Sequence, residues 1–256
     1  MTTRWPAEAI WEAVAPLLPG FTVEILSEVD STNTELMRRA RAGGTDPVLL
    51  VAESQTAGRG RLGRDWRRAP GASLTFSLGL PLAPADWSGL SLAVGLSLAT
   101  SLNPAIGLKW PNDLWWQERK LGGILIETAA VGAGRQAIIG VGLNIALPTC
   151  SDGLRTPAAA LQELLPGIDA PLTLLRLAQP LARTLKSFES GGFSPFVAGF
   201  HERDVLSGRE VVLSDGTQGV ARGIDPSGAL LVHTAAGLQR LTSSEVSVRP
   251  RPDVNP

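Results

Sequence analysis

The chain has 256 residues, of which 44% are hydrophobic and 18% are charged, and its formal net charge is −1. This composition predicts a folded protein with one large domain, alone or beside a small one, and it excludes an intrinsically disordered chain. The balanced charge excludes a general attraction to nucleic acid or membrane, so any site for an anion must be local.

Residues that could mark another class of protein are scarce. Cysteine occurs once, at Cys150, which excludes an internal disulfide and a cysteine-rich zinc site. The two histidines, His201 and His233, lack the spacing of metal ligands. No segment is long enough to span a bilayer, and the first residues lack the apolar run of a signal peptide. We therefore expect a cytoplasmic protein with no membrane partner.

Helical and strand-like patterns alternate over residues 1–205. Strands are expected at 22–29, 48–53, 72–80, 106–110, 114–116, 123–128 and 136–145. Helices are expected at 6–18, 30–41, 87–102, 157–165, 172–190 and 193–200. The second helix has capping-box spacing between Thr32 and Glu35. The pattern predicts a mixed β-sheet with packed helices, an α+β or α/β layer architecture.

The tail of the chain changes character. Residues 207–249 hold about five short strand-like runs, separated by turn clusters at 214–216, 225–228 and 235–237. Short strands at this spacing predict a small SH3-like β-barrel. We therefore divide the chain into a larger domain over residues 1–205 and a C-terminal domain over residues 206–256.

A loop rich in glycine and arginine separates two of the expected strands. Its glycines are suited to close approach of the backbone to a ligand, and its arginines to the oxygens of a carboxylate or phosphate. These residues are Gly58, Arg59, Gly60, Arg61, Gly63 and Arg64. No Gly-Lys-Ser/Thr follows, so this is not a Walker A loop. Taken alone, the loop is as consistent with a solvated basic turn as with an anion site.

Lysine is rare in this chain, since 20 of the 23 basic residues are arginines. Lys109 begins the run Lys-Trp-Pro-Asn-Asp, which ends at Asp113 directly after an apolar strand. Lys120 precedes two glycines that open another strand. The lysine, asparagine and aspartate of the first run could together hold an anion, a polar substrate atom and a carboxylate that orients them or binds a metal, but the run is also an ordinary β-turn sequence. A lone lysine at a strand start, such as Lys120, is often solvated. Asn144 ends a strand and could equally contact a ligand or form a turn.

Five segments in this order resemble the biotin protein ligase family. They are Ser31–Asn33, Gln55–Arg61, Lys109–Asp113, Lys120–Leu125 and Gly140–Asn144. The resemblance runs from about residue 24 to residue 249 and includes the tail. It implies the fold shared by biotin ligases and class II aminoacyl-tRNA synthetases, with an SH3-like C-terminal domain.

The resemblance also implies an activity. Such enzymes join biotin and ATP into biotinyl-5′-adenylate, then acylate one lysine of a biotin carboxyl carrier protein. It implies Lys120, Arg61, Lys109 and Asp113 as catalytic residues, with Asp113 as a ligand of Mg²⁺. It implies biotin and ATP contacts from Ser31, Thr32, Asn33, Gln55, Gly58, Arg59, Gly60, Arg61, Arg64, Trp66, Lys120, Gly123, Leu125 and Asn144. In this assignment Asn144 contacts the adenine, Trp66 packs on the ligand, and the loop orders when the ligand binds.

Two departures from the family pattern qualify these expectations. The Ser-Thr-Asn motif begins at Ser31, which leaves no room for the winged helix-turn-helix that some members carry. We therefore expect a monofunctional ligase that binds no DNA, as a monomer or homodimer. The segment 149–161 aligns with the adenine-side loop of the family but lacks the expected aromatic residue near Ala158.

Three other functions are compatible with parts of the pattern. A lipoate or octanoate ligase or transferase has a distantly similar fold, but octanoyl transfer needs a cysteine nucleophile, and Cys150 follows the wrong strand. A non-catalytic module that binds biotinyl adenylate would be expected to lose Lys120 or the loop arginines. An RNA-binding protein fits poorly with a nearly neutral chain.

Overall fold

The computed structural model describes residues 3–66, 71–147, 156–242 and 248–250. Its α-helices are α1 (Ala7–Val14), α2 (Thr32–Arg41), α3 (Leu90–Leu102), α4 (Leu161–Leu164), α5 (Ala170–Gly191) and α6 (Val197–His201), and its 3₁₀ turns are η1 (Arg61–Gly63) and η2 (Ser194–Phe196). The strands of the larger sheet are β1 (Thr22–Val29), β2 (Val48–Gln55), β3 (Ser73–Pro81), β4 (Gly107–Lys109), β5 (Asp113–Trp116), β6 (Arg119–Val131) and β7 (Gly134–Asn144). The strands of the smaller sheet are β8 (Glu210–Leu213), β9 (Gln218–Ile224), β10 (Leu230–Thr234), β11 (Gly237–Leu241) and β12 (Val248–Pro250).

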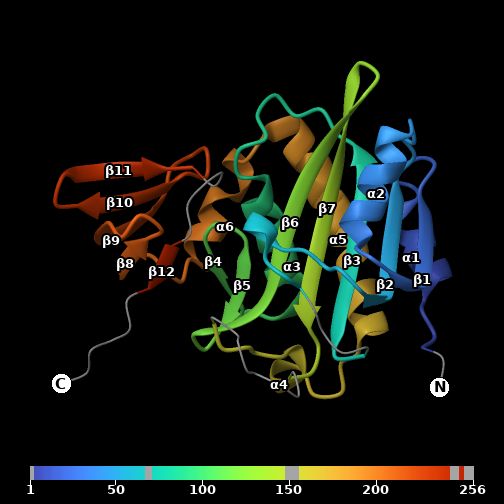
Figure 1. Ribbon diagram of the computed structural model, residues 1–256, viewed down its shortest axis with the longest axis horizontal. Coiled ribbons are helices and arrows are strands. Elements are labelled where there is room, and N and C mark those ends of the chain that lie inside the picture. Colours follow the sequence, from blue (N-terminus) through green and yellow to red (C-terminus); the bar gives the residue numbers. More distant parts are fainter. Residues whose placement is uncertain (1–2, 67–70, 148–155, 243–247, 251–256) are drawn as a thin grey trace.

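The larger sheet has seven strands in the order β1-β2-β3-β7-β6-β5-β4 (Figure 1). Strands β1 and β2 pair in parallel because α2 carries the chain back between them, whereas the other neighbours pair antiparallel. This confirms the predicted mixed sheet with packed helices. The β6–β7 hairpin is the longest pairing and runs from Gly122–Leu143 to Val131–Gly134.

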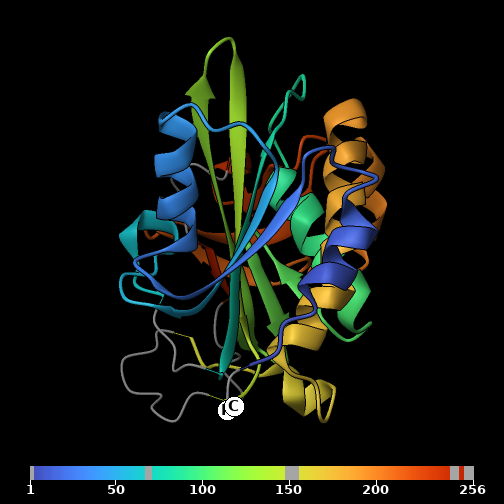
Figure 2. The ribbon, with the colours of Figure 1, turned by 90° about the vertical axis from the view of Figure 1, so that its right-hand side faces the viewer.

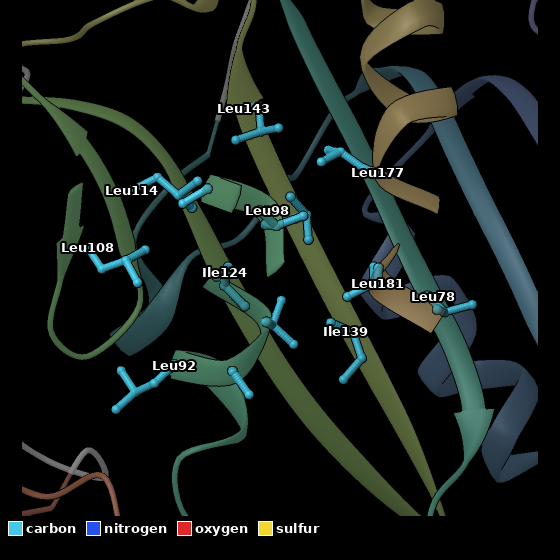
Figure 3. Packing of buried hydrophobic residues seen from close by; sticks show 14 of the residues in the cluster. Leu78, Leu92, Leu98, Leu108, Leu114, Ile124, Ile139, Leu143, Leu177 and Leu181 are labelled. Carbon is cyan, nitrogen blue, oxygen red and sulfur yellow. The ribbon is translucent and has the colours of Figure 1, made fainter. Parts of the chain in front are cut away.

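Helices cover both faces of this sheet unequally. Figure 2 shows α2 alone on one face and α1, α3 and α5 together on the other. The main hydrophobic cluster lies under the three helices, where leucine side chains of α3 and α5 meet leucine and isoleucine side chains of β3, β6 and β7 (Figure 3). A smaller cluster lies under α2. The thin α2 side leaves part of the sheet uncovered by helix, and the candidate site lies on that part.

The tail forms a five-stranded antiparallel sheet in the order β11-β10-β9-β8-β12, as predicted for a small SH3-like domain. Its buried residues, including Val211, Ala221 and Leu230, belong to the same hydrophobic cluster as the larger sheet. The two parts of the chain therefore share one continuous core. No helix in the described ranges has the length and apolar character needed to cross a membrane.

One turn of the smaller sheet contacts the Lys109–Asp113 segment directly. The fully buried indole of Trp110 donates a hydrogen bond from Nε1 to the carbonyl oxygen of Gly228, at 3.0 Å. Asp225 holds this turn, because its Oδ1 accepts from the backbone N–H groups of Ser227 and Ala229. Burial alone would raise the pKa of Asp225, but these bonds and those from the side chains of Ser227 and Arg240 lower it to about 2. The turn is therefore fixed by an ionised aspartate at neutral pH.

Three local details differ from the predicted elements. The segment expected to be helical at 157–165 is helical only in α4, because Pro157 and Ala159 instead make backbone hydrogen bonds to Lys120, beside β6. The strand expected at 123–128 is longer, since β6 begins at Arg119. Helix α2 is capped by Ser31, whose Oγ accepts from the N–H of Thr34, so the predicted Thr32 cap is wrong.

Asp204 lies at the junction between the two sheets. Its backbone forms a bridge with Leu108 of β4, and its Oδ1 accepts from the N–H of Leu206 at 2.9 Å. Its Oδ2 is buried and has no hydrogen-bond partner among the described residues. Burial therefore raises the pKa of Asp204, and the hydrogen bond from the Leu206 N–H and the nearby His201 offset this effect only in part.

Replacing Asp204 by asparagine is expected to stabilise the fold at neutral pH by about 1 kcal/mol, because asparagine avoids the cost of burying an ionised carboxylate, and a shift of one pKa unit corresponds to about 1.4 kcal/mol. A raised pKa means that the folded state binds the proton more tightly than the unfolded state. The protonated carboxyl of Asp204 therefore contributes fully to the free energy of unfolding below pH about 4. This contribution is lost as the pH rises through the pKa of Asp204 in the folded state. Asparagine keeps the cap to Leu206 and cannot ionise. Urea unfolding of both proteins from pH 4 to pH 8 tests this, and a difference that does not shrink towards pH 4 would contradict it.

Candidate active site

A cavity of about 730 Å³ opens on the α2 side of the larger sheet. Its size is typical of a site for a small ligand. Four parts of the chain enclose it: the start of α2, the loop that follows β2, the β4–β5 turn, and strands β3, β6 and β7. Its lining includes the predicted residues Ser31, Thr32, Asn33, Gln55, Arg59, Gly60, Arg61, Arg64, Trp66, Lys109, Asp113, Lys120, Gly123 and Leu125.

The floor of the cavity is polar and buried. Ser31, Thr32 and Asn33 begin α2 and are each at most 3% exposed. The N–H of Thr32 donates to Gln55 Oε1 at 2.8 Å, which joins the start of α2 to the end of β2. Hydrogen-bonding groups without water must find partners in a ligand or in the protein. This end of the cavity therefore favours a ligand with its own donors and acceptors.

The opposite wall carries positive charge. Lys120 of β6 places Nζ 2.7 Å from Asp113 Oδ1 and 5.9 Å from the centre of the Trp66 ring. Lys109 lines the same wall, with Nζ 5.0 Å from the centre of the Trp115 ring. Register explains the arrangement, because β5 pairs with both β4 and β6 and so brings Lys109, Asp113 and Gly123 into adjacent rows. The two lysines and the aspartate predicted from the sequence therefore converge.

The glycine-arginine loop closes the cavity and contacts two of its walls. Arg61 Nη1 donates to Asn112 Oδ1 at 3.2 Å, and Asn112 Nδ2 donates to the carbonyl of Ile124 at 2.8 Å. Burial lowers the pKa of Arg61 from its ordinary value. The negative charge of Asp113 raises this pKa in part, and the positive charge of Arg64 lowers it further. On the other side, Arg59 contacts Glu127 of β6 at 3.1 Å.

Two glycines of the site are required for close contact. A Cβ on Gly142 of β7 would lie 2.4 Å from Cε2 of Trp66, so the indole packs directly on the strand. A Cβ on Gly58 would lie 2.1 Å from the carbonyl oxygen of Trp66, whose N–H donates back to Gly58 at 2.8 Å. Gly58 therefore fixes the base of the loop, although it does not line the cavity.

Asn144 is also absent from the cavity wall. Its side chain is fully buried, and its Nδ2 donates to the carbonyl oxygens of Lys120 at 3.1 Å and Ala159 at 2.9 Å. In this arrangement it holds the backbone of Lys120 rather than facing the cavity, and its contact with adenine stays a prediction. Most of the adenine-side segment at 149–161 lies outside the described residues, but Thr156 and Ala158 line the cavity.

Several lining residues were not singled out from the sequence as ligand contacts. They are Leu62, Asp65, Thr75, Phe76, Pro111, Val141, Thr156 and Ala158. Most of them lie within or beside the predicted motifs, so the spacing of those motifs was the available signal. Thr75 and Phe76 are different, because they belong to β3, which carries no predicted site residue. Nothing in its apolar pattern distinguishes the part of β3 that reaches the cavity.

Comparison with known proteins supports the family resemblance inferred from the sequence. Residues 26–144 match the model of the biotin/lipoate A/B protein ligase family, and residues 206–249 match the biotin protein ligase C-terminal domain. The chain is 32% identical to a biotin–[acetyl-CoA-carboxylase] ligase of Paracoccus denitrificans, over 87% of this chain and 98% of that protein. It is 35% identical to the bifunctional ligase/repressor BirA of Escherichia coli, over 91% of this chain and 75% of that protein.

Solved structures agree with these matches. A biotin protein ligase from Aquifex aeolicus, in complex with biotin and ATP, superposes with a TM-score of 0.76 and 31% identity. The superposition covers 90% of this chain and 99% of that one. Sequence and fold lead to one conclusion. The chain belongs to the biotin protein ligase family.

Proposed function

We propose that this chain, a ligase by family, activates biotin with ATP to biotinyl-5′-adenylate and transfers the biotinyl group to a lysine of a biotin carrier domain. The observation that carries the proposal is the polarity of the cavity. One end is a set of hydrogen-bonding groups at the buried Ser31 and Thr32 and the half-buried Gln55, and the other end holds Lys109 and Lys120. Biotin has a ureido ring at one end and a carboxylate at the other, and it matches this order.

In the first step a carboxylate oxygen of biotin attacks the α-phosphorus of ATP, and the bond from that phosphorus to pyrophosphate breaks. Both reactants are anions, so the residues nearby must reduce their repulsion and stabilise the charge that develops. Lys120 supplies a positive charge at the carboxylate and α-phosphate. Lys109 and the loop residues Arg59, Arg61 and Arg64 supply charge around the remaining phosphates.

In the second step the amine of the carrier lysine attacks the acyl carbon of the adenylate. The bond from that carbon to the phosphate oxygen breaks, AMP leaves, and the amine loses a proton. No protein nucleophile takes part, which fits a cavity whose described lining contains no cysteine. The loop excludes water while the adenylate waits for the carrier, because hydrolysis would otherwise compete with transfer.

Magnesium would be held mainly by the phosphates of ATP. The described residues hold no group of three or more histidine, cysteine, aspartate or glutamate side chains suited to a metal ion. Mg²⁺ commonly takes one or two protein carboxylates and completes its shell with phosphate and water. Asp113 fits such a role, and the ion would supply charge neutralisation at the phosphates.

A lipoate or octanoate ligase is the alternative within the same fold. The distal ends of those acids carry no N–H or C=O groups, so they would form no hydrogen bonds with the polar groups of the floor. A site built to hydrogen-bond its substrate rejects an analogue that lacks those groups. The floor therefore favours biotin.

The test is transfer to a carrier domain. The protein is incubated with ATP, Mg²⁺, biotin and a biotin carrier domain, and the mass of the carrier is measured. We expect a carrier mass increased by one biotinyl group, and no increase when ATP is omitted. Parallel reactions with lipoate and octanoate should leave the carrier, and a lipoyl domain, unmodified. Transfer of either acid in place of biotin would overturn the proposal, and adenylate binding without any synthesis would indicate a non-catalytic module.

A further inference from the structure

Two polar residues outside the cavity wall are connected to its floor. Ser77 lies in the middle of β3 and is fully buried. Its Oγ is 2.7 Å from Thr32 Oγ1 and 2.6 Å from Asn33 Oδ1. Glu127 of β6 accepts from Asn33 Nδ2 at 2.9 Å and from Arg59 Nη2 at 3.1 Å. One chain of contacts therefore runs from the floor at Thr32 to the first arginine of the loop.

The orientation of Asn33 is fixed by its surroundings. Its Nδ2 has two acceptors, the carbonyl of Leu125 at 3.1 Å and Glu127, so this atom must be the amide nitrogen. Its oxygen then faces Ser77. A Cβ on Gly140 would lie 2.1 Å from that oxygen, so the strand beside it has room for the amide only because residue 140 is glycine.

The direction of the hydroxyl protons follows. Ser77 has one proton and two short contacts, and Asn33 Oδ1 can only accept, so the proton of Ser77 goes to Asn33. The contact between Ser77 and Thr32 then requires the proton of Thr32. Gln55 Oε1 lies farther from the Thr32 hydroxyl, at 3.1 Å, and it already accepts the Thr32 N–H. The Thr32 oxygen is left with lone pairs and can only accept from a ligand.

We infer that Ser77 and Glu127 are positioning residues that make the floor an acceptor for a ligand N–H and couple it to the loop. The inference rests on the proposed function, since the ligand N–H is that of a ureido ring. The carboxylate of Glu127 is the last group in this series of hydrogen bonds before the loop, and it binds Arg59, whose Nε also donates to Thr34 Oγ1 at 3.2 Å. Binding at the floor and retention under the loop therefore depend on the same side chains.

Two single variants separate the effect of Ser77 on the floor from the effect of Glu127 on the loop. Ser77→Ala removes the acceptor of the Thr32 proton, and we expect the KM for biotin to rise about tenfold while the KM for ATP changes less than about twofold. Glu127→Gln keeps an acceptor for Asn33 but weakens the hold on Arg59, and we expect release of biotinyl adenylate to accelerate about tenfold. A general structural defect would raise both KM values and would not single out biotin.

Matched controls remove similar groups elsewhere. Thr173→Val deletes a buried hydroxyl in the first turn of α5, which donates to the carbonyl of the N-cap residue Asp169 at 2.6 Å. Glu118→Gln weakens a surface pair with Arg209 at 2.7 Å. Both controls should keep the wild-type KM for biotin and the wild-type release rate. Thermal melting of every variant shows whether it folds, and Glu127→Gln decides the matter if Ser77→Ala does not fold.

The double variant tests the coupling. Because both residues act through Asn33, the combined effect on adenylate release should be smaller than the product of the two single fold-changes. An effect equal to the product would overturn the coupling, and single variants that match their controls would overturn the positioning roles. Failure of the proposed function is distinguishable, since the wild-type protein would then transfer no biotin.

Discussion

Replacing Lys120 by alanine is expected to slow synthesis of biotinyl adenylate by about 10²- to 10³-fold, the usual effect of removing one preorganised group that stabilises developing charge. Lys120 lines the cavity, and its Nζ lies 2.7 Å from Asp113 Oδ1 at the cationic wall. Alanine removes that charge and leaves Asp113, an anion, facing two anionic substrates. The side chain is partly exposed, at 29%, so its loss leaves no large cavity in the core.

The measurement is pyrophosphate release under saturating ATP and biotin, with thermal melting to show that the variant folds. Lys186→Ala is the matched control, because Lys186 is an exposed lysine of α5 that pairs with Glu189 outside the site. The control should retain the wild-type rate. A rate for Lys120→Ala near that of the control would remove Lys120 from the catalytic residues.

Replacing Arg61 by alanine is expected to release biotinyl adenylate faster by about 10- to 100-fold, the usual range for loss of a charge-assisted hydrogen bond to an anion. Arg61 holds the loop to the β4–β5 turn through Asn112, at 3.2 Å. Its guanidinium is desolvated enough that burial lowers its pKa, so its charge acts on an anion with less screening by water. Alanine removes both the tether and the charge.

Release is measured by loading the protein with labelled adenylate and following its loss after dilution into unlabelled ligand. Arg183→Ala provides the control, since Arg183 lies exposed on α5, on the opposite face of the sheet. Faster release should also increase the share of adenylate that is hydrolysed instead of transferred to the carrier. An unchanged release rate would show that the loop connects two strands without retaining the ligand.

The larger elements of the fold could be predicted from the sequence because their signals are local. Alternating apolar runs marked the strands, and turn residues such as Gln117 and Glu118, which have φ of 47° and 59°, marked the hairpins. The helix expected at 157–165 was wrong for most of its length because its backbone hydrogen bonds go to Lys120, far away in sequence. Local propensity carries no information on such a partner.

The candidate site divides in the same way. Its cations were found because each lies in a short run with unusual residues, such as Lys109 among so many arginines. Ser77 and Glu127 were not, since each contacts Asn33 across 44 or 94 residues and sits in an ordinary strand pattern. The role of Asn144 in holding the Lys120 carbonyl also depends on tertiary contacts. What the sequence conveys is the set of charges, and what it leaves out is the hydrogen bonding that orients them.

The hydrogen bond from Trp110 to Gly228 has a consequence for the order in which the protein is made. A ribosome completes the Lys109–Asp113 turn more than a hundred residues before it reaches Gly228. Until then, the indole that lies next to Lys109 has no acceptor from the smaller sheet. Domains generally fold as units during synthesis, beginning with the N-terminal one. A nascent chain therefore carries its lysines and arginines without the last constraint on their position, and the enzyme becomes complete only when the final fifth of the chain has folded onto the rest.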